Sequence, residues 1–425
     1  MERACHSGQR CKNGPVDAIG LTAKELSPPP RSWWIRLWQP FWALPLAVVV
    51  VSFAAALALP ALDRQLGASL PYVFAGGPDG ARTMLSSIAG AMISVTGLVF
   101  SITMVVLQLA SSQFTPRVLG AFLRNRVSQF TLGVFTASFV YSLTVLRSVR
   151  GTDSDEFVPQ VSVTVAFLLV VASVALFLAF IHHITTSIQV SRVISRVGDA
   201  TSRVIDRLYQ PDVATDGPLP ELGVPSGVVR CGPRHGRVAT ASYMRLMDLA
   251  TDHDGVIEVL VRHGDQRTEG QALARLYGLD SDIADDVEDV IFLETERTIE
   301  FDPGYGFQQL VDIAIRALSP GTNDPTTAVE GLDEIQRLLR PLVQRPNPPS
   351  AFRDEEGIIL VVWRPQRIED LIELAFTEIV HYGKDAPQVR GRLVEILTDL
   401  LEVARPPYHD VLARHLAAVE AGPVR

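Results

Sequence analysis

The sequence predicts a multi-pass α-helical membrane domain with four transmembrane helices, followed by a cytoplasmic α+β domain that is mainly helical. Four long runs without a charged residue lie in the first half of the 425-residue chain. Each is at least as long as the ~20 residues that a helix needs to cross the hydrocarbon of a bilayer. Residues 1–210 carry 17 Lys and Arg against 10 Asp and Glu, whereas residues 211–425 carry 21 against 37. A basic membrane-associated half thus precedes an acidic half, and a purely soluble protein is excluded.

The four runs cover residues 37–62, 83–116, 127–146 and 157–191. The first follows more than thirty mostly polar residues and has no short apolar core with a clear cleavage site, so we interpret it as a retained span rather than a signal peptide. We therefore expect three parts. Residues 1–32 form a disordered cytoplasmic tail, residues 33–210 form the four-helix membrane domain with a helical connector, and residues 211–425 form the cytoplasmic domain.

The distribution of Lys and Arg around the runs predicts the orientation. Thirteen flank the runs on one side, in the N-terminal tail, the second loop and the segment after the fourth run, which includes Arg196 and Arg203. The other side has only Arg64, Arg82, Arg147 and Arg150. Because cytoplasmic loops carry the excess of Lys and Arg, both termini should lie in the cytoplasm.

The second run carries small and hydroxyl-bearing residues that fall close to one helical face. These are Ser87, Gly90, Ser94, Gly97, Ser101 and Gln108. One interpretation is a tight seam between helices, since small residues let backbones approach and hydroxyls bond across the contact. The other is that several copies of this face surround a polar path that replaces part of an ion's hydration shell. No carboxylate or arginine interrupts any of the four runs, which argues against an ion-coupled carrier.

The acidic half is predicted to alternate strands and helices before it becomes helical. A β-hairpin is expected over residues 227–240, a helix over 243–252, a strand over 256–261 and a buried strand over 357–363. Amphipathic helices are expected over 307–318, 329–342, 366–382, 387–404 and 407–421. Ten acidic residues lie between 280 and 302, and one helical face could present several of them to a divalent cation. We interpret them instead as a solvated face, or as a contact with basic loops at the membrane.

Between two of these helices, the sequence SPGTNDPTT predicts a sharp elbow. Gly321 can take a positive φ after the first helix, while Asp324 can cap the next one and Pro325 can occupy its first position. Ser319 and Asn323 complete the turn, and Arg316 is the nearest candidate counter-charge. The alternatives are a capped corner and an anion site at the exposed helix N-terminus.

The segment from residue 301 to 330, with its core QLVDIAIRALSPG and the following NDP, resembles the signature of a family of bacterial predicted membrane proteins known as domain of unknown function 2254. The small-residue second run, which ends in QFTPR, and the order of the parts are also similar to that family. The resemblance covers the chain from about Trp33 and implies a bacterial plasma (inner) membrane location. It supplies no activity and no catalytic residue.

We therefore expect an integral membrane protein that forms a homo-oligomeric channel or passive transport protein, with the cytoplasmic domain regulating it. The alternative is a membrane-anchored scaffold or sensor that binds a cytoplasmic partner or ligand. An enzyme is not indicated, since there is no phosphate-binding loop, dinucleotide turn or nucleophile elbow. We expect the lipid bilayer as a partner, no cofactor and no metal, and no nucleic acid, because the acidic half opposes phosphate binding.

Overall fold

The computed structural model of the chain describes residues 40–66, 74, 76–113, 126–152, 155–187, 189–211, 221–354 and 356–421. These residues form two compact units, of which one ends at Val193 and the other begins at Ile194. The domain boundaries predicted at residues 32 and 210 stay predictions, since residues 1–39 and 212–220 lie outside the described ranges.

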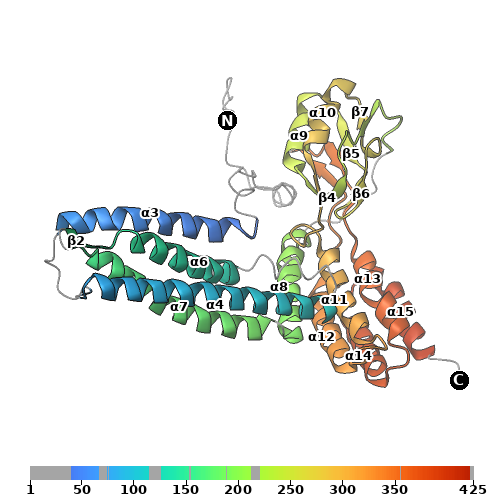
Figure 1. Cartoon of the computed structure of the whole chain (residues 1–425). Helices are drawn as coiled ribbons and strands as arrows, with labels where there is room; N and C mark the ends of the chain where they lie inside the picture. The colour runs from blue at the N-terminus through green and yellow to red at the C-terminus, as the bar shows by residue number, and fades with distance from the viewer. Residues whose placement is uncertain are drawn as a thin grey trace, which may run out of the picture. The chain divides into compact units, whose positions relative to one another are not determined.

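The N-terminal unit contains four helices that are long and apolar enough to cross a membrane, at the places that the charge-free runs predict. They are α3 (Ala43–Leu66), α4 (Pro78–Gln113), α6 (Arg126–Leu146) and α7 (Gln160–Ser187), and they run alongside one another in Figure 1. At 1.5 Å per residue α4 extends over about 54 Å, which is longer than the ~30 Å of hydrocarbon that a perpendicular helix has to cross.

Helix α6 is the centre of this unit, since it packs more extensively than α7 does against α3 and α4, and it also packs against α7. Within its most apolar stretch 56% of the residues are buried, against 11–17% in the other three helices. Gly133 lets α3 approach closely, because a Cβ at this position would lie 3.0 Å from the Cα of Pro45. Between α6 and α7, the short strands β1 (Arg150–Thr152) and β2 (Asp155–Phe157) pair antiparallel.

The C-terminal unit begins within α8 (Val190–Leu208), a helix with one apolar and one charged face. Its apolar residues, including Val197, Val204 and Ile205, are buried. The helix α11 (Pro303–Ala317) approaches α8 at Gly306, where a Cβ would overlap the hydroxyl of Thr201. Only a residue without a side chain fits this contact.

Two sheets form one part of the C-terminal unit (Figure 1). The first has the strand order β3-β7-β5-β10-β9 and the second β6-β4-β8. The strands are β3 (Gly227–Arg230), β4 (Gly236–Ala241), β5 (Val256–Val259), β6 (Gln266–Arg267), β7 (Ala272–Tyr277), β8 (Ile291–Glu294), β9 (Ala351–Arg353) and β10 (Ile359–Val362). Strand β10 lies parallel to β5, whereas the other neighbours are antiparallel. The strands predicted over 256–261 and 357–363 are thereby confirmed.

The β-hairpin predicted over residues 227–240 is wrong. Strand β3 pairs with β7 in the first sheet, whereas β4 pairs with β6 and β8 in the second. A turn in which Arg234 N donates to Gly232 O leads the chain from one sheet to the other. Alternating apolar residues indicate that a segment is a strand, but the partner strand depends on residues far away in the sequence.

Helices complete the unit. The helix α9 (Tyr243–Asp252) contacts β5 and β10, while the short α10 (Ala284–Asp289) contacts β3 and β8. The remaining helices α12 (Pro325–Leu342), α13 (Ile368–Tyr382), α14 (Pro387–Val403) and α15 (His409–Ala421) pack with α11 into a bundle. The amphipathic helices predicted for this region are confirmed, although α11 begins four residues before its predicted range. Helix α12 begins at Pro325, where the predicted elbow places its first residue, and so extends the amphipathic range 329–342 by four residues.

Candidate functional site

The small-residue face of α4 lies on the outside of the N-terminal unit. All six predicted residues, Ser87, Gly90, Ser94, Gly97, Ser101 and Gln108, are exposed. The side of α4 that packs into the unit is the opposite one, with Leu85, Ile88, Met92 and Val99 buried. The face therefore stays together, as its helical spacing predicts, and among the described residues of the N-terminal unit it lies opposite the buried side of α4.

The backbone of this face is open to close approach. A Cβ placed on Gly90 or Gly97 would meet nothing within 4 Å. The hydroxyl of Ser94 donates to the carbonyl of Gly90 at 2.9 Å, so it has a partner within its own helix. From Ser87 to Ser101 the face extends over about 21 Å, which covers most of the ~30 Å hydrocarbon thickness.

Most of the buried polar side chains in the described part of the N-terminal unit lie instead on α6, and the others, Ser162 and Ser173, lie on α7. Thr131, Ser138 and Ser142 are fully buried and recur at spacings of seven and four residues, which places them on one helical face. Ser138 Oγ lies 3.4 Å from Ser173 Oγ of α7. Among the described residues, neither the Thr131 nor the Ser142 hydroxyl has a hydrogen-bond partner. The sequence analysis did not select these residues, although α6 has the lowest mean hydropathy of the four spans.

A second polar contact joins the end of α3 to the start of α7. The carboxylate of Asp63 accepts hydrogen bonds from the backbone N–H groups of Val161 and Ser162, both at 3.1 Å, and from the Ser162 hydroxyl at 2.7 Å. These N–H groups belong to the first turn of α7, which has no intrahelical acceptor for them. Asp63 thus acts as an N-cap from another helix and fixes where the two helices meet.

The elbow between α11 and α12 forms as a capped corner. Asp324 Oδ1 accepts from the backbone N–H of Thr327 at 3.1 Å, and Pro325 occupies the first position of α12, as predicted. The Thr327 hydroxyl donates to Asp324 Oδ2 at 2.6 Å, and these bonds lower the pKa of Asp324. The N-terminus of α12 is therefore bonded to the protein's own carboxylate, which favours the corner over an anion site.

One detail of the predicted elbow is wrong. The residue with positive φ is Asn323, at 47°, and not Gly321. Asn tolerates this region because its short polar side chain bonds locally. Ser319 closes the end of α11, since its N–H and its hydroxyl both donate to the carbonyl of Arg316. The role of the exposed Arg316 side chain as a counter-charge stays a prediction.

Sequence analysis missed a second capping carboxylate at the other end of α11. Asp302 is 3% exposed and accepts from Tyr305 N at 3.0 Å and from Arg297 Nε at 2.6 Å. The pair lies against the turn that follows β5, because a Cβ on Gly264 would fall 2.9 Å from Asp302 Oδ2. The signal was present, since Asp302 precedes Pro303 just as Asp324 precedes Pro325.

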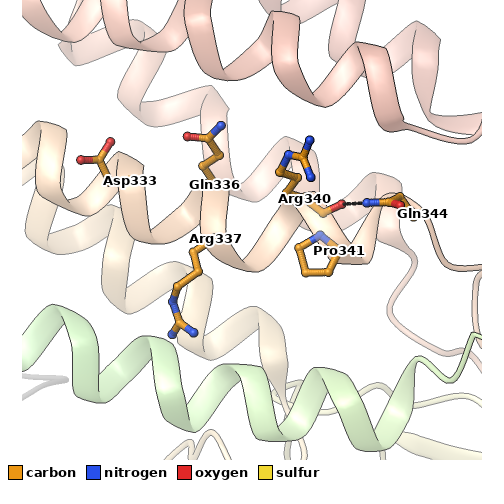
Figure 2. A pocket seen from close by; sticks show the side chains of 6 residues that line it. All are labelled: Asp333, Gln336, Arg337, Arg340, Pro341 and Gln344. Atoms are coloured by element: carbon orange, nitrogen blue, oxygen red, sulfur yellow. Dashed lines mark hydrogen bonds between the residues drawn. The ribbon is translucent and has the colours of Figure 1, made fainter.

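A hollow of about 380 Å³ lies along α12, lined by Asp333, Gln336, Arg337, Arg340, Pro341 and Gln344. In Figure 2, Arg337 points toward α8 while Arg340 points to the opposite side of the helix. Arg337 pairs with Asp199 of α8 at 3.1 Å, and Arg340 pairs with Asp399 of α14 at 3.1 Å. These charges hold three helices together, so we interpret the hollow as a packing feature.

The acidic segment 280–302 does not form one helical face. Only α10 and a single 3₁₀ turn lie in its first part, where Arg234 pairs with Glu288 at 2.7 Å and with Asp289 at 3.7 Å. Burial opposes ionisation of Glu288, but bonds from Arg234 and Gly232 outweigh it and lower its pKa. The described residues contain no group of three or more His, Cys, Asp or Glu that could hold a metal ion.

Comparisons with known proteins agree with the membrane character of the chain. A family model described as a predicted membrane protein, DUF2254, matches residues 38–399. An uncharacterized protein of Mycobacterium bovis and one of Mycobacterium tuberculosis are each 29% identical over 406 residues, which is 93% of this chain and 78% of theirs. No solved structure matches the chain.

Proposed function

The chain belongs to the DUF2254 family of predicted membrane proteins, and from this premise we propose that it is a homo-oligomeric channel or passive transport protein of the bacterial plasma membrane. In this proposal the four apolar helices cross the bilayer and both termini lie in the cytoplasm. The thirteen Lys and Arg on one side of the runs, against four on the other, support that orientation. The acidic C-terminal unit is then cytoplasmic and regulates the path.

The observation that carries the proposal is the outward position of the small-residue face of α4. Lipid provides no hydrophobic force that drives helices together, so helix contacts in a bilayer depend on close packing and on polar side chains. A glycine face that is open in the protomer suits contact with another copy of the chain. Ser87, Ser94 and Ser101 would then line the contact, or the water-filled space that several copies enclose.

Gln108 lies where such a path would open, toward one end of α4. It lies seven residues beyond Ser101, about 10 Å further along α4, and its amide is exposed. Counted from Ser87, Gln108 lies about 32 Å away, which matches the thickness of the hydrocarbon. An amide at that depth reaches the polar interface, where an ion exchanges its water for protein ligands.

The test uses the purified full chain in liposomes that contain an ion-sensitive dye. Replacing Ser94 and Ser101 with Leu should abolish flux, since it removes two hydroxyls and fills the open face. The matched control is Ile93→Leu with Phe100→Leu, because these residues are exposed on α4 beside the face and remain apolar. Flux that the serine variant retains, or an unchanged chain that conducts nothing under any gradient, contradicts the proposal.

The alternative, a membrane-anchored scaffold or sensor, is favoured by a separate observation. Asp282, Asp285 and Asp286 are exposed, and no described residue pairs with them, so they offer a negative surface to a basic partner. This alternative predicts that the full chain in detergent captures the same partner with and without Ser94→Leu and Ser101→Leu. Loss of capture in Asp285→Asn with Asp286→Asn would favour it over a channel.

A further inference from the structure

Helix α8 carries two arginines that share one face of the C-terminal unit. Arg196 and Arg203 are seven residues apart, so they project on nearly the same side of the helix, about 10 Å from each other. Both side chains are exposed. We call Arg196 and Arg203 the α8 basic face.

No described residue neutralises this face. Neither Arg196 nor Arg203 has a hydrogen bond, an ion pair or a ring contact within the part of the chain that the structure describes. The other charges of α8 in this unit are engaged. Asp199 pairs with Arg337 at 3.1 Å and Asp206 pairs with Arg345 at 2.7 Å, while Arg207 donates to the carbonyl of Glu300 and lies over the ring of Phe301.

Helix α8 lies in the basic half of the chain, where residues 1–210 carry 17 Lys and Arg against 10 acids. Its two acids, Asp199 and Asp206, are paired with arginines from outside α8 rather than with Arg196 or Arg203. An exposed cation gains little from isolated surface pairing. Because the acids of α8 are already engaged by Arg337 and Arg345, Arg196 and Arg203 leave a positive surface for an anionic partner.

The chain places this face close to the end of the fourth apolar helix. Helix α7 ends at Ser187 and α8 begins at Val190. Three residues extended at up to ~3.6 Å each and six helical residues at 1.5 Å put Arg196 within about 20 Å of that end. The headgroup layer of a bilayer is several ångströms thick, and its field acts over a further ~8 Å, so a long arginine side chain can reach it.

We propose that the α8 basic face binds the phosphate groups of anionic lipids in the leaflet next to the C-terminal unit. This inference rests on the membrane location given in the proposed function. Guanidinium groups match phosphate oxygens well, and anionic lipids attract basic segments that follow a transmembrane helix. The apolar face of α8 is buried within its own unit, so the helix binds by charge and does not insert.

The expected strength follows from the charge count. Each arginine near an anionic membrane surface changes the binding equilibrium by about fivefold, so losing both should weaken binding about 30-fold. Because the contact is electrostatic and lies at the surface, salt should weaken it strongly. Insertion of an apolar face would instead be insensitive to salt.

The experiment uses the full chain in lipid nanodiscs, with Cys5 and Cys11 replaced by Ser and a fluorophore on Ser195→Cys. Ser195 is exposed beside Arg196, and the remaining Cys231 is buried. A quencher attached to lipid headgroups reports how close α8 lies to the surface. The discs contain either zwitterionic lipid alone or increasing amounts of phosphatidylglycerol, and a fluorophore on Asp252→Cys of the exposed end of α9 serves as the reference.

Quenching at position 195 should rise with the content of phosphatidylglycerol and fall with salt. In the double variant Arg196→Gln with Arg203→Gln, the apparent equilibrium constant for binding to anionic lipid should be about 30-fold lower. The matched control Arg245→Gln with Arg405→Gln removes two other exposed arginines and should change nothing. The reference position should stay constant throughout.

Equal quenching in zwitterionic and anionic discs, or a double variant that behaves like the unchanged chain, overturns the inference. The inference is also overturned if the fluorophore at position 195 changes its signal with a soluble polyanion in zwitterionic discs but not with anionic lipid. The α8 basic face would then bind a soluble partner. If the unchanged chain shows no ion flux but its quenching at position 195 behaves as expected, the channel proposal fails and the lipid-binding inference stands. A chain that does not enter the discs contradicts the membrane location and this inference with it.

Discussion

Removing the carboxylate of Asp302 should loosen α11 and the turn after β5 together. Asp302 is almost completely buried, caps α11 through Tyr305 N and bonds Arg297 Nε at 2.6 Å. Gly264 in that turn, with φ at 85°, packs against the same pair. One side chain thus connects the sheets to the helical bundle within the C-terminal unit.

Two substitutions separate its two contributions. In Asp302→Asn the side-chain oxygen can still cap the helix, but the ion pair with Arg297 is lost. Breaking a buried pair costs about 3–5 kcal/mol, and we expect about 2–3 kcal/mol here because the Arg297 side chain keeps 27% of its exposure to water. Asp302→Ala also loses the cap, which adds about 1 kcal/mol.

Hydrogen–deuterium exchange of the full chain in detergent micelles measures the effect locally. A loss of about 3–4 kcal/mol corresponds to about 150- to 1,000-fold more frequent opening. Peptides that cover residues 303–317 and 262–266 should exchange faster in Asp302→Ala, while peptides from α14 and α15 should not. The matched control is Asp324→Ala, a cap without an ion pair, which should cost about 1 kcal/mol in α12.

This reasoning is refuted if the two alanine substitutions have small and equal effects on hydrogen exchange. If Asp302→Ala and Asp324→Ala each change exchange by less than about tenfold, the pair with Arg297 contributes nothing to stability. Faster exchange in α11 with an unchanged turn at residues 262–266 would contradict the connection between sheet and bundle.

Three further predictions concern single buried positions. Burial lowers the pKa of His415, so the folded unit binds this proton less tightly than the unfolded chain. Thermal unfolding should thus show full stability above pH ~6.5 and a loss of at most about 1.4 kcal/mol per pH unit below it, which His415→Gln removes. Gly306→Ala should cost about 1–3 kcal/mol in thermal unfolding, and less when Thr201 is also changed to Ala, since the added Cβ overlaps that side chain. Gly133→Ala should lower the thermal stability of the N-terminal unit in detergent by a similar amount, whereas Gly97→Ala, which has open space around it within the protomer, should leave the stability of the protomer itself unchanged.

Local patterns explain which elements were predictable. Charge-free runs predicted the four long helices, because hydrophobicity summed over about twenty residues needs no knowledge of neighbours. Asp324 and Pro325 predicted the start of α12, because capping involves residues three apart. The same local signal at Asp302 and Pro303 was available and would have corrected the predicted start of α11.

The remaining features depend on contacts between distant residues. The strands β3 and β4 were recognised, but their partners β7 and β8 lie about 45 residues or more further along the chain. Positive φ at Asn323 rather than Gly321 reflects how α11 and α12 meet, which residue type alone does not decide.

For the N-terminal unit, the sequence alone determined that Ser87, Gly90, Ser94, Gly97, Ser101 and Gln108 share one face of α4, because helical periodicity is a property of the helix itself. Only the tertiary structure decided that this face points outward and that Thr131, Ser138 and Ser142 of α6 point inward. The reason is physical: which side of a helix is buried is set by the shapes of the neighbouring helices, as at Gly133 of α6, whose missing side chain lets Pro45 of α3 come close.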